Sequence, residues 1–192
     1  MQGFVGGVLI AGTIAIGLFL SRQPEQAPAP TAPMAAPSFP AAQPPPPAAP
    51  AEPSSPREVA DSLFNEAMMA SEQNDQGTLG QVLPGAIAAY RSLPGLDDDG
   101  TYHLALLELA GGQLTEARAS CGKLLSKNPN HLLALGVAIR VAMKANDAAA
   151  ARDLGQTLLK AYDAESVRQL PEYRDHERML PTYRAEAMAV AK

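Results

Sequence analysis

Tryptophan is absent from this sequence, only one cysteine is present, and aromatic residues make up just 5% of the chain. A core must therefore be built from Ala, Leu, Val and Met, a composition that favours helices. Cys121 has no second thiol to pair with, so no intramolecular disulfide forms and cysteine usage does not indicate the compartment. The net charge is -5. Because no cluster of Lys and Arg is present to release counterions from phosphate, the sequence predicts no nucleic-acid partner.

Signatures of catalysis are also missing. We find no phosphate-binding loop, nucleophile elbow or paired-carboxylate motif. Of the three histidines, we single out His176 as the candidate ligand, because Glu172 lies four residues earlier, the spacing of one helical face. Two ligands without a third are a weak metal signal, and an exposed pair on one helical face is the simpler interpretation. The sequence thus predicts no catalytic residue, no cofactor and no metal site, with a small-ligand or metal-binding enzyme as the remote alternative.

The N-terminal part contains one long apolar run. Gly3 to Leu20 carries no charge over eighteen residues, about the length that spans a bilayer as a helix. We therefore expect a single-pass membrane anchor over residues 1–22. A cleaved signal peptide is the alternative, but no basic residue precedes the run. Small residues recur in this run at a spacing of four: Gly3, Gly7, Ala11 and Ala15. They would lie on one face of the helix, where a neighbouring membrane helix could pack closely. The alternative is that they reflect only the high glycine and alanine content of membrane helices.

Residues 23–56 have a different composition. Pro24 to Pro56 holds thirteen of the eighteen prolines of the chain, mixed mostly with alanine. Such a segment lacks the apolar bulk to offset the entropy of ordering, so we expect a disordered, extended Pro/Ala-rich linker. At about 3.1 Å per residue it reaches on the order of 100 Å. A proline-rich ligand for a groove on another protein is the alternative interpretation.

Residues 57–192 show helical periodicity and an internal repeat. Four features recur after 34 residues: Gly112 as Asn146, Ala117 as Ala151, and Leu124 and Leu125 as Leu158 and Leu159. Gly and Asn take positive φ at low cost, and small residues let helices cross closely. Each helical hairpin is too thin to bury its own apolar stripe and must stack on a neighbour.

This pattern resembles the tetratricopeptide repeat (TPR), in its membrane-anchored bacterial form. The resemblance implies an all-α, TPR-like helical-hairpin solenoid, which follows the expected transmembrane helix and linker. Another antiparallel helical bundle is the alternative. We divide the helical domain into a degenerate hairpin at 57–95, repeats at 98–131 and 132–163, and capping helices at 164–192. Within it we expect Asp97 to Asp99 to cap a helix and Cys121 to be a core residue.

A duplicated motif lies in the C-terminal part. Leu170-Pro171-Glu172-Tyr173-Arg174 recurs as Leu180-Pro181-Thr182-Tyr183-Arg184. Since proline fits the first turn of a helix, we expect helices from Pro171 to Met179 and from Pro181 to Ala191, or one kinked helix. Tyr and Arg are enriched in interface hot spots, so Tyr173, Arg174, Tyr183 and Arg184 are an alternative contact surface.

TPR arrays bind through an inner groove lined by the first helix of each hairpin. The resemblance therefore implies a partner-binding groove, although the Lys/Asn/Arg clamp of chaperone-binding members is not reproduced. By position in the repeat, the groove candidates are Asp99, Tyr102, Leu106, Leu109, Leu133, Gly136, Arg140, Met143 and Lys144.

These features together predict a non-catalytic, membrane-anchored scaffold for protein–protein interaction. We expect an accessory or structural subunit of a multi-subunit integral membrane complex, respiratory, photosynthetic or secretory. A tethered assembly factor or chaperone adaptor, of the cytochrome-maturation or translocon type, is the alternative. The expected location is the bacterial cytoplasmic (inner) membrane, with the helical domain on the extracytoplasmic, periplasmic side.

Overall fold

The computed structural model describes residues 55–192. The expected anchor over residues 1–22, its small-residue face and all but the last two residues of the expected linker lie outside this part. Residues 55–192 form eight α-helices and no strand, so the all-α prediction is confirmed for them. None of these eight helices combines the length and the apolar character that crossing a bilayer requires.

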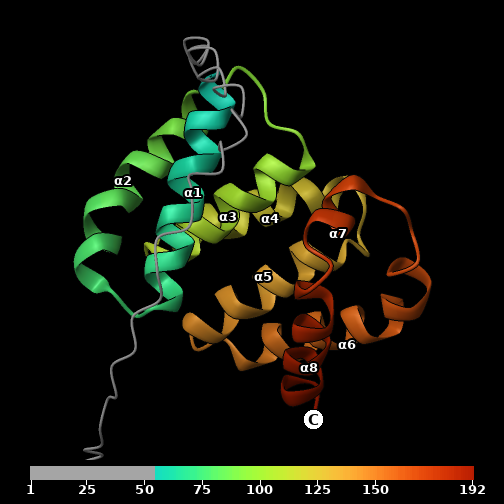
Figure 1. Cartoon of the computed structure of the whole chain (residues 1–192). Helices are drawn as coiled ribbons and strands as arrows, with labels where there is room; N and C mark the ends of the chain where they lie inside the picture. Colours follow the sequence, from blue (N-terminus) through green and yellow to red (C-terminus); the bar gives the residue numbers. More distant parts are fainter. Residues whose placement is uncertain (1–54) are drawn as a thin grey trace, which may run out of the picture. The chain divides into compact units, whose positions relative to one another are not determined.

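Six of the helices form three consecutive hairpins (Figure 1). Ser55 caps the first helix, with Pro56 in its first turn, so the helix includes the last proline that the sequence assigned to the linker. The hairpins are α1 (Pro56–Glu72) with α2 (Gln76–Ser92), α3 (Asp98–Ala110) with α4 (Leu114–Lys127), and α5 (Leu132–Lys144) with α6 (Ala148–Glu165).

All three hairpins turn in the same way. Asn74, Gly112 and Asn146 each have a φ between 56° and 70°. The residue that follows each of them donates its N–H to the carbonyl five positions earlier, at 2.8, 2.8 and 2.9 Å. This is the Schellman cap, which only Gly and Asn adopt at low cost. The predicted equivalence of Gly112 and Asn146 is confirmed, and Asn74 extends it to the first hairpin.

Helix α3 is shared between two hydrophobic clusters. Leu104 and Leu107 pack with α1 and α2, whereas Tyr102 and Ala105 pack with the helices that follow. Asp97 caps α3 by accepting from the N–H of Gly100, as expected of an acid before a helix. The two faces of α3 thus join the hairpins into one stack.

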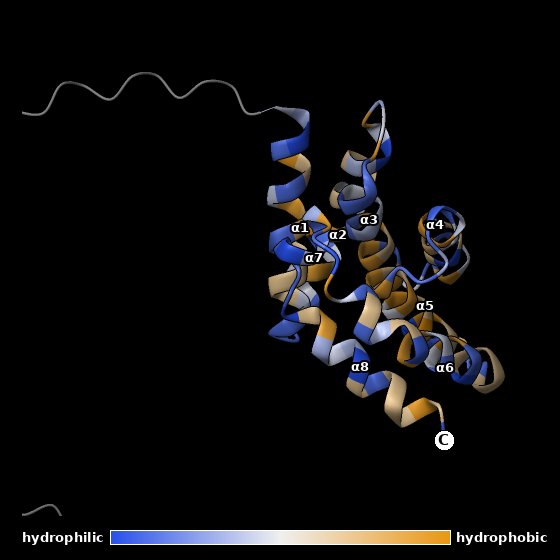
Figure 2. Cartoon of the chain, turned by 90° about the vertical axis from the view of Figure 1, so that its right-hand side faces the viewer, coloured by the Kyte–Doolittle hydropathy of each residue, from blue (hydrophilic) through white to orange (hydrophobic). Residues whose placement is uncertain are grey.

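Helix α5 is the centre of the second cluster. Ten of its thirteen residues are buried. It lies among α4, α6 and α8 and is coloured as hydrophobic along most of its length in Figure 2. A helix that is apolar on all sides must be covered on all sides, and α4 and α6 alone leave its inner face open.

The C-terminal segment supplies the missing cover. The helices here are α7 (Pro171–Asp175) and α8 (Met179–Val190). The first is therefore shorter than the expected helix from Pro171 to Met179, and the second starts before Pro181. Helix α8 packs along both α5 and α6, and α7 packs against α3 (Figure 1).

Candidate functional site

The predicted inner groove is filled by the chain's own C-terminal segment. Tyr102 and Leu133, expected to contact a partner, are fully buried, and Leu106 is only partly exposed. Tyr102 donates to or accepts from the hydroxyl of Tyr183 at 3.0 Å. Tyr102 therefore stabilises the packing of α8, and neither Tyr102 nor Leu133 is open to a second protein in this structure.

Two glycines define how closely α8 approaches. A Cβ atom built on Gly136 would lie 2.2 Å from Cγ of Tyr183, so the phenol ring rests directly on the backbone of α5. A Cβ atom on Gly155 of α6 would lie 2.8 Å from Cγ2 of Val190 and 3.1 Å from the carbonyl oxygen of Ala187. Small residues at helix crossings are thus used here to admit a helix of the same chain.

The remaining groove candidates lie at the edge of this contact. Arg140 forms an ion pair with Glu186 of α8 at 2.6 Å, and its guanidinium lies 4.7 Å from the centre of the Tyr183 ring. Lys144 donates to the carbonyl oxygen of Leu109 at 3.0 Å. Met143 is 50% exposed. Of the nine groove candidates, Met143 and Lys144 are the two that are exposed.

The duplicated Tyr-Arg motif is mostly internal. The hydroxyl of Tyr173 accepts from the N–H of Leu132 at 2.8 Å, at the start of α5, and donates to Glu165 at 3.2 Å. Tyr173 and Tyr183 are both buried. Arg174 is exposed, and Arg184 is exposed over the ring of Tyr162, 4.6 Å from its centre. The two tyrosines therefore bind α7 and α8 to the hairpins, and only the arginines face solvent.

Glu172 and His176 do not form the exposed pair that their spacing suggested. Glu172 is buried and its carboxylate lies 3.1 Å from Nε2 of His131. Helix α7 ends at Asp175, so His176 turns away and contacts Asp99 and His103 on α3. The short length of α7 is the physical reason for this correction.

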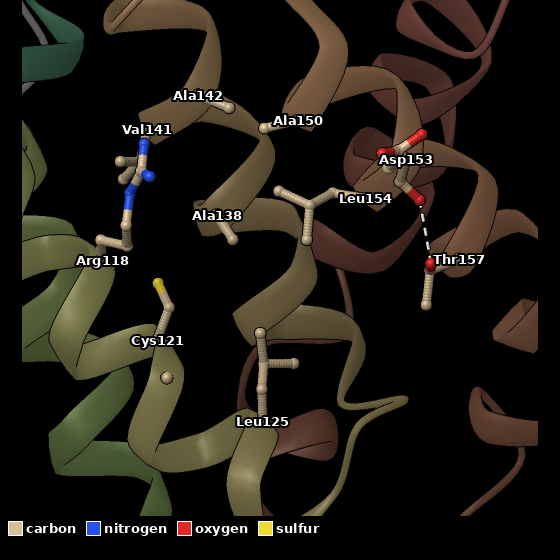
Figure 3. Close-up of a pocket in the computed structure, with 11 residues that line it drawn as sticks. Arg118, Cys121, Leu125, Ala138, Val141, Ala142, Ala150, Asp153, Leu154 and Thr157 are labelled. Atoms are coloured by element: carbon tan, nitrogen blue, oxygen red, sulfur yellow. Dashed lines mark hydrogen bonds between the residues drawn. The ribbon is translucent and has the colours of Figure 1, made fainter. Parts of the chain in front are cut away.

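An open apolar pocket lies on the other side of α5, between α4 and α6. Its volume is about 410 Å³. Small side chains of α5 form its floor, and Leu125 of α4 and Leu154 of α6 form its walls (Figure 3). The lining residues are Arg118, Cys121, Gly122, Leu125, Ala138, Val141, Ala142, Ala150, Asp153, Leu154 and Thr157.

The pocket is apolar inside and charged at its margins. Arg118 lies at one side and Asp153 at the other, and both are exposed (Figure 3). The sulfur of Cys121 points toward the interior of the pocket in Figure 3. Burial, reinforced by the carboxylate of Glu108, raises the pKa of the Cys121 thiol to about 12. Cys121 is thus a neutral core residue, as expected, and offers no thiolate for nucleophilic chemistry.

No direct signal in the sequence pointed to this pocket. Its residues have the small or apolar character of any helix crossing, and Cys121 was assigned to the core. The available signal was the density of small residues at facing positions: Gly122, Ala138, Ala142 and Ala150. Because these side chains are short, they leave the space between α4, α5 and α6 open in this structure.

Comparison with known proteins finds no matching family model, no matching curated protein and no matching solved structure.

Proposed function

We propose that residues 55–192 form a TPR-like domain that binds another protein through the pocket between α4 and α6. The observation that carries this proposal is that the pocket is open and apolar, while the inner face of the hairpins is occupied by α7 and α8. Apolar pockets with a few polar groups at the margin are preferred binding sites.

The pocket fits an apolar side chain of a partner. About 410 Å³ accommodates a large aliphatic or aromatic side chain and its neighbours, of the kind that dominates interface energies. Arg118 and Asp153 at opposite margins favour an acidic group on one side of that side chain and a basic group on the other (Figure 3). The proposed partner is therefore a protein segment with one apolar residue flanked by charges of opposite sign.

At the level of the whole chain, we propose a non-catalytic, membrane-anchored scaffold. The charge-free run Gly3 to Leu20 supports the anchor, and the proline-rich residues 23–56 support a spacer between it and the helical domain. The proposed role is that of an accessory subunit of a membrane complex in the bacterial inner membrane, with the helical domain in the periplasm. A tethered assembly factor or adaptor is the competing role.

The test is copurification with matched variants of the full chain. A C-terminal tag is used to recover the protein from membranes in mild detergent. Gly122→Glu places a charge at the pocket, and Gly85→Glu places the same charge in an exposed position of α2; both glycines have open space around them. Loss of a stoichiometric partner from the first variant alone supports pocket binding, whereas equal retention in both refutes it.

A second pair of changes separates the two roles. Gly7 and Ala11 are replaced together by Leu, which removes the small-residue face of the expected anchor. A partner complex lost from this variant indicates a structural subunit held within the membrane. Substoichiometric partners that are unaffected by the change indicate a tether and a transient adaptor.

A further inference from the structure

Three ligating side chains from two distant parts of the chain converge near α7. Nε2 of His176 lies 2.8 Å from Oδ1 of Asp99 and 3.0 Å from Nε2 of His103. The distance from Nε2 of His103 to Oδ1 of Asp99 is 3.6 Å. Atoms bound to one metal ion at about 2.0–2.2 Å lie about 3.0–3.5 Å apart, so the triangle has nearly the size of a metal coordination face.

The hydrogen bond at Nδ1 of His103 leaves its Nε2 without a proton, as the acceptor in the contact with His176. The hydroxyl of Tyr90 donates its only hydrogen to the carboxylate of Asp61, because a carboxylate accepts only. The same oxygen lies 2.8 Å from Nδ1 of His103 and must therefore accept from it. A neutral His103 with its proton on Nδ1 presents the lone pair of Nε2 to His176 and Asp99. Metal-binding histidines are oriented in this way by outer partners.

The position of the His103 ring is fixed by packing. Phe64 stacks on it with ring centres 3.9 Å apart, and Tyr90 meets it edge-on at 5.8 Å. Burial lowers the pKa of His103 to about 4, so the imidazole is neutral near pH 7. Helix α3 also spaces Asp99 and His103 four residues apart on one face. Two of the three ligands are thus preorganised before His176 arrives.

The surrounding charge favours a cation. Asp61, Asp97 and Asp99 all contact Arg57, with 2.9, 2.9 and 2.7 Å separating the paired atoms. Three carboxylates against one guanidinium leave two negative charges beside the histidines. Arg57 binds Oδ2 of Asp99, so Oδ1 remains directed at the imidazoles. A carboxylate ligand held through its second oxygen is a common outer-shell arrangement.

We propose that Asp99, His103 and His176 bind a divalent transition metal ion of the zinc class. Two imidazole nitrogens and one carboxylate oxygen are ligands that Zn²⁺ accepts, and they leave a fourth position. The side chains of Asp99 and His176 are 22% and 18% exposed, which gives water access to that position. The ion links the C-terminal segment to α3 and thereby holds α7 over the inner face of the hairpins. This inference is independent of the proposed pocket for a partner.

The test is metal binding by the full chain, purified in mild detergent with a histidine-free tag. Zn²⁺ binding is measured by titration calorimetry. Co²⁺ binding is measured separately, in the absence of Zn²⁺, by visible absorption. We expect one ion per chain, with the ligand-field bands of nitrogen and oxygen coordination. His176→Ala should weaken binding by at least about tenfold, since even the loss of an outer-shell partner costs about 10–100-fold. His176→Gln is the second variant in case the first misfolds, which circular dichroism will report.

Asp175→Asn is the matched control, because Asp175 is exposed and adjacent to His176 yet is not one of the three converging side chains. It should bind Zn²⁺ as the unaltered chain does. Tyr90→Phe removes the acceptor that fixes the His103 proton and should weaken binding by about 10–100-fold. Zn²⁺ should also raise the Tm of the unaltered chain and leave that of His176→Ala unchanged. Failure of the unaltered chain to bind, or equal binding by His176→Ala, would overturn the proposal.

Discussion

The replacement of Gly136 by alanine tests the most specific contact of the fold. Helix α5 contains this glycine in its interior, where alanine ordinarily stabilises a helix by about 0.5–1 kcal/mol. The new methyl group would lie 2.2 Å from Cγ and 2.4 Å from Cδ1 and Cδ2 of Tyr183. Cγ is the ring atom bonded to Cβ and lies on the axis of ring rotation, so rotating the ring about the Cβ–Cγ bond does not relieve the clash. Either Tyr183 leaves its site or α8 moves.

The cost follows from what Tyr183 loses. The side chain is fully buried, and burial of a large side chain contributes about 1.5–3 kcal/mol. Its hydrogen bond to Tyr102 contributes about 0.5–1.5 kcal/mol more. The gain in helix propensity offsets part of this, so we expect Gly136→Ala to lower the free energy of unfolding by about 1–3 kcal/mol, the usual range for overpacking.

Gly122→Ala is the control of opposite sign. Gly122 is also inside a helix, but nothing lies within 4 Å of its added Cβ. The free energy of unfolding should therefore rise by about 0.5–1 kcal/mol. Urea unfolding of the fragment 55–192, followed by circular dichroism because the chain has no tryptophan, measures both changes.

A double variant identifies the cause. In a Tyr183→Ala background the clash is absent, so Gly136→Ala should become neutral or stabilising there, with a coupling of about 1–3 kcal/mol to the tyrosine. If Gly136→Ala stabilises the otherwise unaltered fragment as Gly122→Ala does, the ring does not rest on α5. The assignment of the inner face to α8 would then be refuted.

Three further predictions concern buried groups. Because burial raises the pKa of Cys121 to about 12, iodoacetamide at pH 8 should alkylate it far more slowly in native protein than after unfolding in urea. Tyr173→Phe should cost about 1–3 kcal/mol in urea unfolding, since the N–H of Leu132 loses its acceptor in a buried site. The buried carboxylate of Glu108 lies 2.7 Å from the guanidinium of Arg91. Arg91→Met should therefore lower the free energy of unfolding by about 1–3 kcal/mol, because the carboxylate loses its ionic partner. Adding Glu108→Gln should recover part of that loss, because it removes the buried charge.

Local patterns predicted the hairpins because their causes are local. Positive φ at Gly112 and Asn146 follows from the residue type, and the cap at Asp97 follows from an acid placed before a helix. The burial of Cys121 follows from the apolar stripe of α4. Each of these depends on neighbours within about one turn of helix, and the sequence contains that information directly.

The occupant of the inner face was not predictable in this way. Tyr102 and Tyr183 are 81 residues apart, and His103 and His176 are 73 apart. Of the three proposed metal ligands, only Asp99 and His103 have a spacing, four residues, that is visible in the sequence. Two ligands without a third do not indicate a metal site. Position within a repeat indicates which residues face the groove, but it does not indicate that the same chain returns to fill it.

The return of α8 has a physical cause in α5. A helix buried over ten of its thirteen positions needs cover on its inner side, and within residues 55–192 α8 is the element that provides it. A partner entering this face must displace the Tyr183 ring and break the ion pair between Arg140 and Glu186. The pocket between α4 and α6 requires no such displacement. Binding on the outer side is therefore the less costly route, and the metal site proposed at His176 would raise the cost of the inner route further.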